Sequence, residues 1–212
     1  MSVPNKTRGI PRLRSTKGET TAQEILLAAE TVLVETGYHN FSLRKVASSA
    51  GHTLGSLQYY YPTKAALLSA MLDNCISRYV EMFEEIRKKA GTDPEEQFIA
   101  LIRWIVHDLK SEHTTRFFPE VWSLSNHDEH AANFMDAMYG RYRDVLIEVI
   151  ALINPKLSKP QMRRVALFVS ASLEGHTIFI GHDKPWSEES ENIVKLSTQS
   201  FLWLIHSGSI PK

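Results

Sequence analysis

The fold of this chain is decided by residues 43–68, which read LRKVASSAGHTLGSLQYYYPTKAALL. Two short helix-forming segments, residues 43–50 and 54–60, are separated by three residues, so the chain must turn a tight corner between them. The first of the three, Gly51, supplies the backbone freedom that such a corner needs. A pair of short helices at a tight corner is typical of a helix-turn-helix, whose second helix enters the major groove of DNA. We therefore expect binding to double-stranded DNA.

The second helix of this pair has a surface suited to nucleic acid. Leu57 is its apolar anchor, and Val46 and Ala47 face the core from the first helix. The other side chains of residues 54–60 are small, aromatic or hydrogen-bonding, and none is acidic. A helix without carboxylates can approach phosphates without repulsion.

Helical periodicity continues on both sides of the motif, and no segment alternates convincingly with period two. A capping pair at Thr21 predicts a first helix that ends at Gly37. A longer helix is expected from Lys64 to about Lys89, and Asp93 caps the next helix. We therefore predict an all-α fold, with an N-terminal three-helix helix-turn-helix domain and a larger helical domain.

The second half of the chain carries further boundary signals. Pro119 and Pro155 are expected to lie at helix boundaries. A capping pair at Ser158 opens a helix that is apolar nearly all round and is expected to run to Ile180. Ser187 is expected to cap the last helix.

Composition excludes several classes of protein. A chain of 212 residues with 43% hydrophobic and 23% charged residues can bury a core. The single cysteine, Cys75, excludes disulfide scaffolds and thiolate zinc clusters. The longest apolar run, residues 145–153, is far shorter than the roughly 20 residues that span a bilayer, and the basic N-terminus lacks the apolar stretch of a signal peptide. We expect a cytoplasmic protein with no membrane partner.

The net charge of zero hides an uneven distribution. Residues 1–64 hold 8 Lys or Arg against 4 Glu, whereas the rest of the chain holds 16 basic against 20 acidic residues. A basic arm ahead of a folded unit is typical of a polyanion partner, although a solubilising tail has the same composition. Five basic residues face no acid in this arm: Lys6, Arg8, Arg12, Arg14 and Lys17.

No sequence motif indicates catalysis or a metal site. There is no nucleophile elbow, phosphate-cradling loop or dinucleotide fingerprint. Residues 127–130, His-Asp-Glu-His, have metal-binding atoms, but neighbours on a helix point about 100° apart and cannot converge on one ion. We expect neither an enzyme nor a metal or cofactor.

Together with residues 25–42, ILLAAETVLVETGYHNFS, the motif resembles the N-terminal DNA-binding domain of the TetR family of bacterial repressors. The family's usual Val after the turn glycine is His52 here, its frequent Lys is Leu54, and its Tyr-x-His-Phe run is replaced by residues 58–61. The resemblance covers about residues 24–71 and rests on Ala28, Ala29, Gly37, Tyr38, Ser42, Leu43, Arg44, Val46, Ala47, Ala50, Gly51, Gly55, Leu57, Pro62, Lys64, Leu67 and Leu68.

The resemblance implies which residues contact DNA. We expect Gln58 to read a base, because an amide can pair with adenine N6 and N7. Tyr59, Tyr60 and Lys64 are expected to hold phosphates, and Tyr61 is expected to pack in the core. The full set of expected contacts is Arg8, Arg12, Arg14, Ser42, Leu43, Thr53, Leu54, Gly55, Ser56, Gln58, Tyr59, Tyr60 and Lys64.

The resemblance also implies a C-terminal domain that dimerises through its last two long helices and encloses a ligand pocket. We divide the chain into a flexible basic arm (residues 1–16), a DNA-binding domain (17–64) and an effector-binding and dimerisation domain (65–212). An ordinary buried helix pair is the alternative to the dimer. The expected interface residues are Val165, Phe168, Val169, Ser172, Phe201, Leu202 and Ile205.

The expected pocket is lined by aromatic and sulfur side chains of the middle helices, for which plain core packing is the alternative. A carboxylate in an apolar helix, as at Glu174, needs a partner. We expect Glu174 either to bind a cationic or hydroxylated effector or to pair with an arginine across the dimer. The full set is Trp104, Phe117, Phe118, Trp122, Met135, Met138, Glu174 and His176.

These observations predict a TetR-type transcriptional repressor that binds a palindromic DNA operator as a homodimer and is released by an unknown small-molecule effector. In the alternative, the C-terminal domain is a protein-interaction module, and binding of a partner protein releases the DNA.

Overall fold

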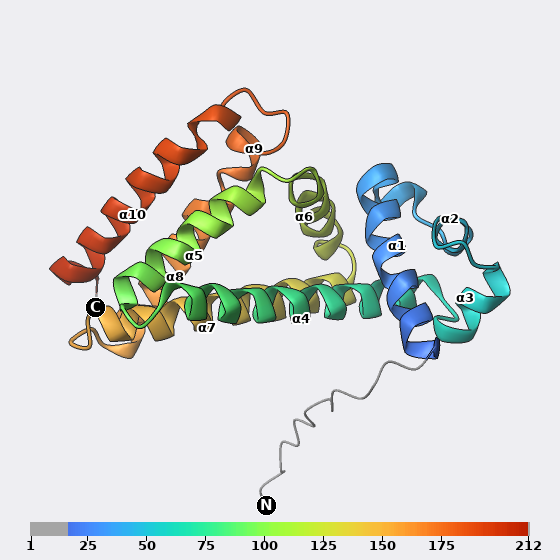
Figure 1. Cartoon of the computed structure of the whole chain (residues 1–212), viewed down its shortest axis with the longest axis horizontal. Coiled ribbons are helices and arrows are strands. Elements are labelled where there is room, and N and C mark those ends of the chain that lie inside the picture. Colours follow the sequence, from blue (N-terminus) through green and yellow to red (C-terminus); the bar gives the residue numbers. More distant parts are fainter. Residues whose placement is uncertain (1–16, 212) are drawn as a thin grey trace, which may run out of the picture.

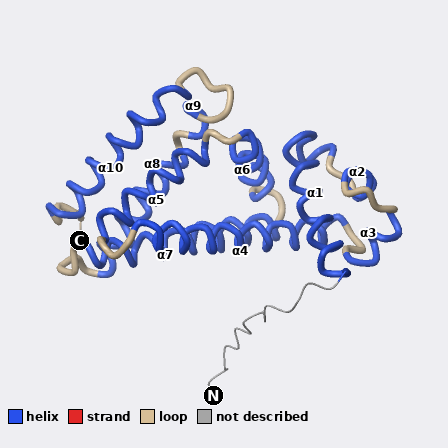
Figure 2. Tube along the Cα trace, in the orientation of Figure 1, coloured by secondary structure: helices blue, strands red, loops and turns tan. Residues whose placement is uncertain are grey.

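The computed structural model describes residues 17–211, and the regular elements in that range are all helical (Figures 1 and 2). The predicted all-α fold is therefore confirmed, with a helix-turn-helix domain followed by a larger helical domain. The elements are α1 (Lys17–Asn40), α2 (Leu43–Ser49), α3 (Leu54–Tyr60), α4 (Lys64–Ala90), α5 (Pro94–Leu109), α6 (Glu112–Ser125), α7 (Glu129–Ile153), α8 (Lys159–Glu174), α9 (Thr177–Ile180), the 3-10 turn η1 (Ser187–Glu189) and α10 (Ser190–Ser207).

Helices α1 to α3 gather at one end of the molecule, and α4 runs from them along the remaining helices (Figure 1). Helix α6 lies against α1, so the larger domain contacts the small one through two helices. The expected DNA contacts Arg8, Arg12 and Arg14 lie outside the described residues.

Local signals explain why α2 and α3 form, although each has only seven residues. Isolated helices this short are unstable in water, so they need caps and packing. Ser42, Thr53 and Thr63 accept hydrogen bonds from backbone N–H groups at the starts of α2, α3 and α4, at 3.4, 3.1 and 3.0 Å. Gly51 turns the corner with a φ of +69°, in the left-handed region that favours glycine. Leu57 is fully buried beneath α3.

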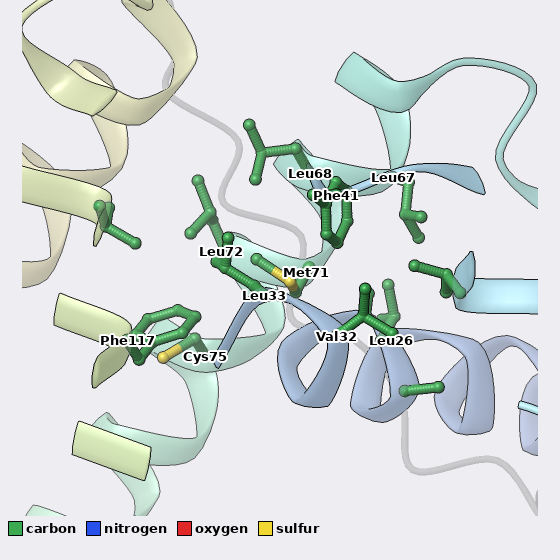
Figure 3. Close-up of a cluster of buried hydrophobic side chains, with 14 of the residues drawn as sticks. Leu26, Val32, Leu33, Phe41, Leu67, Leu68, Met71, Leu72, Cys75 and Phe117 are labelled. Atoms are coloured by element: carbon green, nitrogen blue, oxygen red, sulfur yellow. The ribbon is translucent and has the colours of Figure 1, made fainter. Parts of the chain in front are cut away.

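The buried apolar residues form two clusters. The first joins α1, α2, α3 and the start of α4, and it continues into α6 through Phe117 and Val121. Figure 3 shows Phe117 beside Cys75 and Leu72 of α4. The second cluster fills the space between α4, α5, α7, α8 and α10. The small domain therefore shares its core with α6 of the larger one.

Four predicted boundaries are wrong. The first helix begins at Lys17, four residues before the expected cap at Thr21. Pro119 lies inside α6 and not at its end, because a proline removes a single N–H while the flanking Phe117 and Phe118 remain buried. The helix expected to reach Ile180 ends at Glu174, where glycine weakens helical continuity, and α9 follows after a turn. Ser187 opens the 3-10 turn, and α10 begins three residues later.

Candidate functional site

Helix α3 presents an exposed face that the rest of the small domain holds in place. Gln58 is exposed, and the side chain of Tyr59 is 83% exposed. The Tyr59 ring meets the Tyr60 ring edge to face at 5.2 Å, and Tyr60 in turn packs on the first cluster. Gly55 has no atom within 4 Å of the position where a Cβ would lie, so its backbone is open to a close approach. The face combines an amide, an aromatic ring and bare backbone.

Several other residues that were predicted to contact DNA cap helices or pack against the core of this domain. The hydroxyl groups of Ser42 and Thr53 are the helix caps described above. Leu43 is partly buried against the first cluster. Tyr61, which was predicted to pack in the core, is also partly buried there, and burial raises the pKa of Tyr61. Leu54 and Ser56 are half-buried.

Lys64 of α4 binds Tyr38 of α1 and so links the two helices. The sequence analysis did not predict this contact. Its Nζ lies 3.9 Å from the centre of the Tyr38 ring and donates to the Tyr38 carbonyl oxygen at 3.2 Å. Burial lowers the pKa of Lys64. The exposed basic side chains of the motif are instead Arg44 and Lys45, opposite the buried Val46 and Ala47 on α2. Their spacing from these core residues is the signal that could have identified them.

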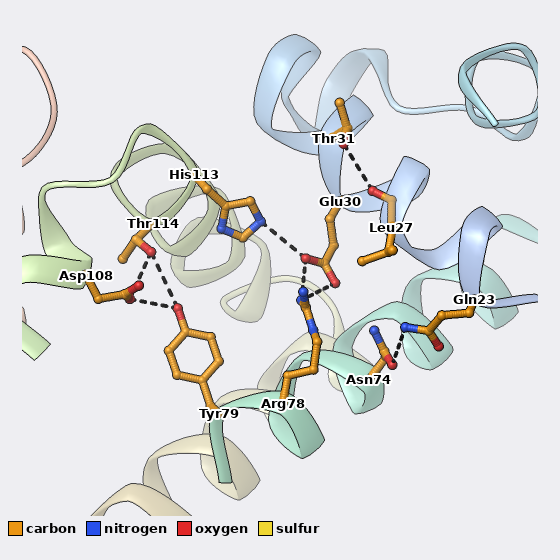
Figure 4. A network of polar contacts seen from close by, with 10 residues as sticks. All are labelled: Gln23, Leu27, Glu30, Thr31, Asn74, Arg78, Tyr79, Asp108, His113 and Thr114. Carbon is orange, nitrogen blue, oxygen red and sulfur yellow. Dashed lines mark hydrogen bonds and ion pairs between the residues drawn. The ribbon is translucent and has the colours of Figure 1, made fainter. Parts of the chain in front are cut away.

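A buried carboxylate joins the small domain to the larger one (Figure 4). Glu30 of α1 is 3% exposed. Arg78 of α4 donates through Nη2 to both of its oxygens at 2.5 Å, and His113 of α6 lies 3.2 Å from Oε2. Three helices therefore meet at one charged group.

The next residues along α4 and α6 point away from Glu30 and bind a second carboxylate. Tyr79 Oη and Thr114 Oγ1 donate to Oδ2 of Asp108, at the end of α5, over 2.9 and 3.0 Å (Figure 4). Neighbouring residues on a helix point about 100° apart, so each helix reaches both carboxylates. We call this set of residues around Glu30 and Asp108 the junction network.

Helix α6 makes a further contact with α1, two turns beyond His113. The backbone N–H of Tyr38 donates to Oε2 of Glu120 at 2.9 Å. The preceding Gly37 has a φ of +70°, and a Cβ there would lie 3.4 Å from the Glu120 carboxylate. Helix α6 thus contacts α1 at Glu30 and again at Tyr38, near the C-terminal end of α1.

Three cavities share walls in the larger domain. The junction cavity, of about 320 Å³, is bounded by Arg78, Tyr79, Met82, Trp104, Asp108, Ser111, His113 and Thr114. The α8 cavity, of about 480 Å³, is bounded by Trp122, Tyr139, Arg143, Leu167, Ser170, Ala171, Glu174, Gly175 and Ile178. Between them lies the central cavity, of about 20 Å³, bounded by Tyr79, Phe83, Trp104, Ile105, Asp108, Leu109, Thr114, Phe118, Met138, Tyr139, Tyr142 and Glu174.

Five of the eight predicted pocket residues line these cavities. Trp104, Phe118, Met138 and Glu174 bound the central cavity, and Trp122 bounds the α8 cavity.

The other three predicted pocket residues line none of the three cavities. Phe117 is fully buried in the first cluster and stacks on His113 at 5.2 Å, so it belongs to the domain junction. Met135 packs against the same cluster. His176 lies in the turn after α8, where burial lowers its pKa.

The wall residues that the sequence analysis missed include Tyr79, Asp108, Tyr139 and Tyr142. Tyr79 is spaced from Phe83, and Tyr139 from Tyr142, by one helical turn, and this spacing is the signal that could have placed them on inward faces. No pattern of this kind marks Asp108.

Both cavity carboxylates are shifted toward the protonated form. Burial raises the pKa of Glu174 to about 7, and the nearby charge of Asp108 adds to the shift, whereas the Tyr139 hydroxyl opposes it. Trp122 Nε1 donates to Tyr139 Oη at 2.9 Å and orients that hydroxyl. Burial also raises the pKa of Asp108, against the hydrogen bonds from Tyr79 and Thr114.

The predicted dimer interface needs correction. Val165, Val169, Phe201 and Ile205 are at most 4% exposed and pack inside the second cluster, which leaves them unavailable to a partner. Phe168 is 55% exposed, and Ser172 and Leu202 are half-buried. Helices α8 and α10 also expose Leu167, Leu196 and Trp203, the last at 67%. Leu167 borders the α8 cavity, so we call the other three, Phe168, Leu196 and Trp203, the α8–α10 face.

The described residues offer neither a metal-binding cluster nor a membrane-spanning helix. Over residues 17–211, no group of three or more His, Cys, Asp or Glu side chains is placed to hold a metal ion. In the same range, no helix has the length and apolar character to cross a membrane.

Comparison with known proteins covers both parts of the chain. A family model for bacterial regulatory proteins of the tetR family matches residues 25–71. An uncharacterized HTH-type transcriptional regulator from the dhlA 5' region of Xanthobacter autotrophicus is 28% identical over 165 residues, covering 76% of this chain and 80% of that protein. The HTH-type transcriptional regulator BetI of Stenotrophomonas maltophilia is 24% identical over 154 residues, covering 72% and 77%.

Solved structures share the fold. Salmonella enterica GusR aligns with a TM-score of 0.72 at 17% identity, over 90% of this chain and 98% of that one. A TetR transcription regulator from Haloarcula marismortui aligns with a TM-score of 0.71 at 19% identity, over 86% and 96%.

The raised pKa of Glu174 predicts a pH-dependent stability. The carboxyl binds its proton more tightly in the folded chain than at its ordinary pKa of 4.5, so ionisation destabilises the fold as pH rises from 4.5 to about 7. Relative to Glu174→Gln, the wild type should lose about 3 kcal/mol of unfolding free energy across this interval. Urea denaturation across this pH range measures the difference, with Glu188→Gln as the exposed control. A difference that does not change with pH would contradict the assignment.

The junction network predicts a stability cost for Glu30→Gln. Removing the charge leaves Arg78 and His113 without their shared partner, and the unfolding free energy should fall by about 1–3 kcal/mol. Glu35→Gln, on the exposed side of the same helix, should change it by less than about 0.5 kcal/mol. Equal effects of the two substitutions in thermal or urea unfolding would show that Glu30 does not join the domains.

Proposed function

We propose that this chain, which belongs to the TetR family of bacterial transcriptional regulators, is a repressor that binds a palindromic operator as a homodimer and releases it when a small molecule binds. The observation that carries the proposal is the exposed face of α3, with Gln58 and Tyr59 on a capped, packed helix. Residues 17–64 form the DNA-binding domain and residues 65–212 the sensing and dimerising domain.

The exposed side chains of the helix-turn-helix take different roles on DNA. Gln58 reads base edges in the major groove, and Tyr59 contacts the backbone or a thymine methyl group beside it. Arg44 and Lys45 hold phosphates, and they replace Lys64 in this role because Lys64 is engaged with Tyr38.

Dimerisation is supported by the α8–α10 face. One seven-residue helix contacts few base pairs, so two copies of α3 in successive major grooves, about 34–36 Å apart, are needed for a specific site. Phe168 and Trp203 are large apolar side chains exposed on neighbouring helices, and a second copy would bury them.

Release of DNA is supported by the shared walls of the cavities and the junction network. A ligand that moves Tyr79 or Thr114 also moves Arg78 and His113, since they are neighbours on α4 and α6. These two residues hold Glu30 on α1, and α1 carries the helix-turn-helix. A ligand with about 100-fold preference for the released spacing would shift the equilibrium by about 2.7 kcal/mol.

The alternative, a C-terminal domain that binds a partner protein, would be favoured if Trp104 and Trp122 filled the interior. They instead border pockets of about 320 and 480 Å³ that open to the surface and are of the size that binds small molecules. The sensing function is therefore the better supported of the two.

Two substitutions on the helix-turn-helix should separate base reading from phosphate binding. Gln58→Ala should relax preference at particular base pairs by about 1–3 kcal/mol and leave the salt dependence unchanged. Lys45→Ala should weaken all sequences alike and reduce the slope of log K against log salt by about 0.9. Fluorescence anisotropy with operator and random duplexes at several salt concentrations measures both.

The matched control for Lys45 is Lys89→Ala, an exposed lysine at the far end of α4, which should change neither quantity. If Gln58→Ala and Lys45→Ala behave alike on specific and random DNA, the proposed roles are wrong.

The α8–α10 face predicts a monomerising substitution. Phe168→Asp places a charge in the proposed interface and should raise the dimer dissociation constant by at least about 100-fold, because burying an unpaired carboxylate is costly. Sedimentation equilibrium measures the shift. Leu27→Asp, which alters an exposed leucine on α1, should leave the dimer intact. A dimer unaffected by the Phe168 substitution would place the interface elsewhere.

A further inference from the structure

The central cavity is small and closed in by aromatic rings. Its volume of about 20 Å³ holds a group the size of one water molecule. The rings of Tyr79 and Trp104 lie 5.7 Å apart, and Phe83 lies 5.5 Å from Trp104, all in edge-to-face contact. A large group cannot enter without separating these rings, whereas an ammonium group fits.

The cavity is lined by oxygen atoms that can accept further hydrogen bonds. Tyr142 is 3% exposed, and its hydroxyl has no hydrogen-bond partner within residues 17–211. Asp108 uses Oδ2 to accept from Tyr79 and Thr114, which leaves Oδ1. The Glu174 carboxylate has the Tyr139 hydroxyl beside it. A buried polar atom without a partner destabilises a fold, so a ligand that supplies donors is favoured here.

Within the described part of the chain, the two carboxylates of the cavity have no partner in an ion pair. Among the described side chains, no Lys, Arg or His forms an ion pair with Asp108 or Glu174. His113, the basic group facing Asp108, pairs with Glu30. The raised pKa values of both carboxyl groups agree with this lack of a cation.

We propose that the central cavity binds the ammonium group of a primary amine, whose apolar body lies in the α8 cavity. An ammonium has three donors, and the cavity offers the three acceptors Glu174, Asp108 and Tyr142. Trp104 and Tyr79 also line the cavity, and aromatic rings attract a cation that lies over them. This inference deepens the proposed function, because the amine would be the effector.

The α8 cavity suits the rest of such a ligand. It shares Tyr139 and Glu174 with the central cavity, so one molecule can reach both. Its walls include Trp122, Leu167 and Ile178, which would cover an aromatic or branched body. Arg143 also borders this cavity and opposes a second positive charge there, so the ligand carries its charge at the end that enters the central cavity.

Four probes of similar shape test the charge and the size of the bound group by isothermal titration calorimetry on the full chain. They are 2-phenylethylamine, 2-phenylethanol, phenethyltrimethylammonium and 3-phenylpropanoate. The primary amine should bind at least about 10-fold more tightly than the neutral alcohol and the bulky quaternary cation, and the anion should bind most weakly. Binding of the alcohol, the quaternary cation or the anion as tightly as the amine, or binding of none of the four, overturns the proposal.

Two substitutions test whether the ammonium group binds in the central cavity. Glu174→Gln should weaken the amine by about 10-fold or more without changing the alcohol, and Glu188→Gln, at an exposed position in η1, should change neither. Tyr142→Phe removes an unpaired hydroxyl, so the chain should fold, yet the amine should bind several-fold more weakly. Unchanged amine affinity in Tyr142→Phe and in folded Glu174→Gln overturns the proposed site.

Operator affinity with and without saturating 2-phenylethylamine separates this proposal from the function on which it rests. If the amine binds in the predicted pattern and operator affinity is unchanged, the cavity assignment stands and ligand release fails. If operator binding is specific but the amine shows no preference over the alcohol, the regulator stands and the amine site fails.

Discussion

The buried carboxylate of Glu30 is the constraint on which the arrangement of the two domains depends. A charge removed from water must be paired, and its partners come from two different helices, Arg78 on α4 and His113 on α6. Helix α1 is therefore held in one position relative to the larger domain. Because α2 and α3 pack on α1, the orientation of the DNA-reading helix is determined by where α4 and α6 lie.

The same two helices supply part of the walls of the junction and central cavities. Tyr79 and Thr114 follow directly after Arg78 and His113 and bind Asp108, so a displacement at one carboxylate is transmitted over a single residue to the other. Helices behave as stiff units, and a small rotation of α4 or α6 alters both ends of the network at once. This arrangement gives a physical route by which occupation of a cavity can change the position of α1 and, with it, the orientation of α3.

The sequence predicted the helix-turn-helix almost to the residue, because caps, a turn glycine and a buried leucine act within a few positions of one another. It was less informative where helices meet from distant parts of the chain. Lys64 was predicted to contact phosphate, but its Nζ lies over the Tyr38 ring of α1. Asp108 becomes a cavity residue only through the packing of α4, α5 and α6. Helix α8 is another example. Because its sequence is almost uniformly apolar, the sequence did not show which face is buried and which is exposed.

The continuous core between the small domain and α6 bears on how such regulators can diverge. Phe117 and Val121 complete the packing around α1 and the start of α4, so a recombination event that joined this N-terminal segment to an unrelated sensor would leave a hole in both partners. Successful exchange between relatives must carry α6 along or match its apolar shape. The unit that can be exchanged between such proteins therefore includes two segments that are distant in the gene and packed together in the fold. A single crossover in the linear sequence would separate them.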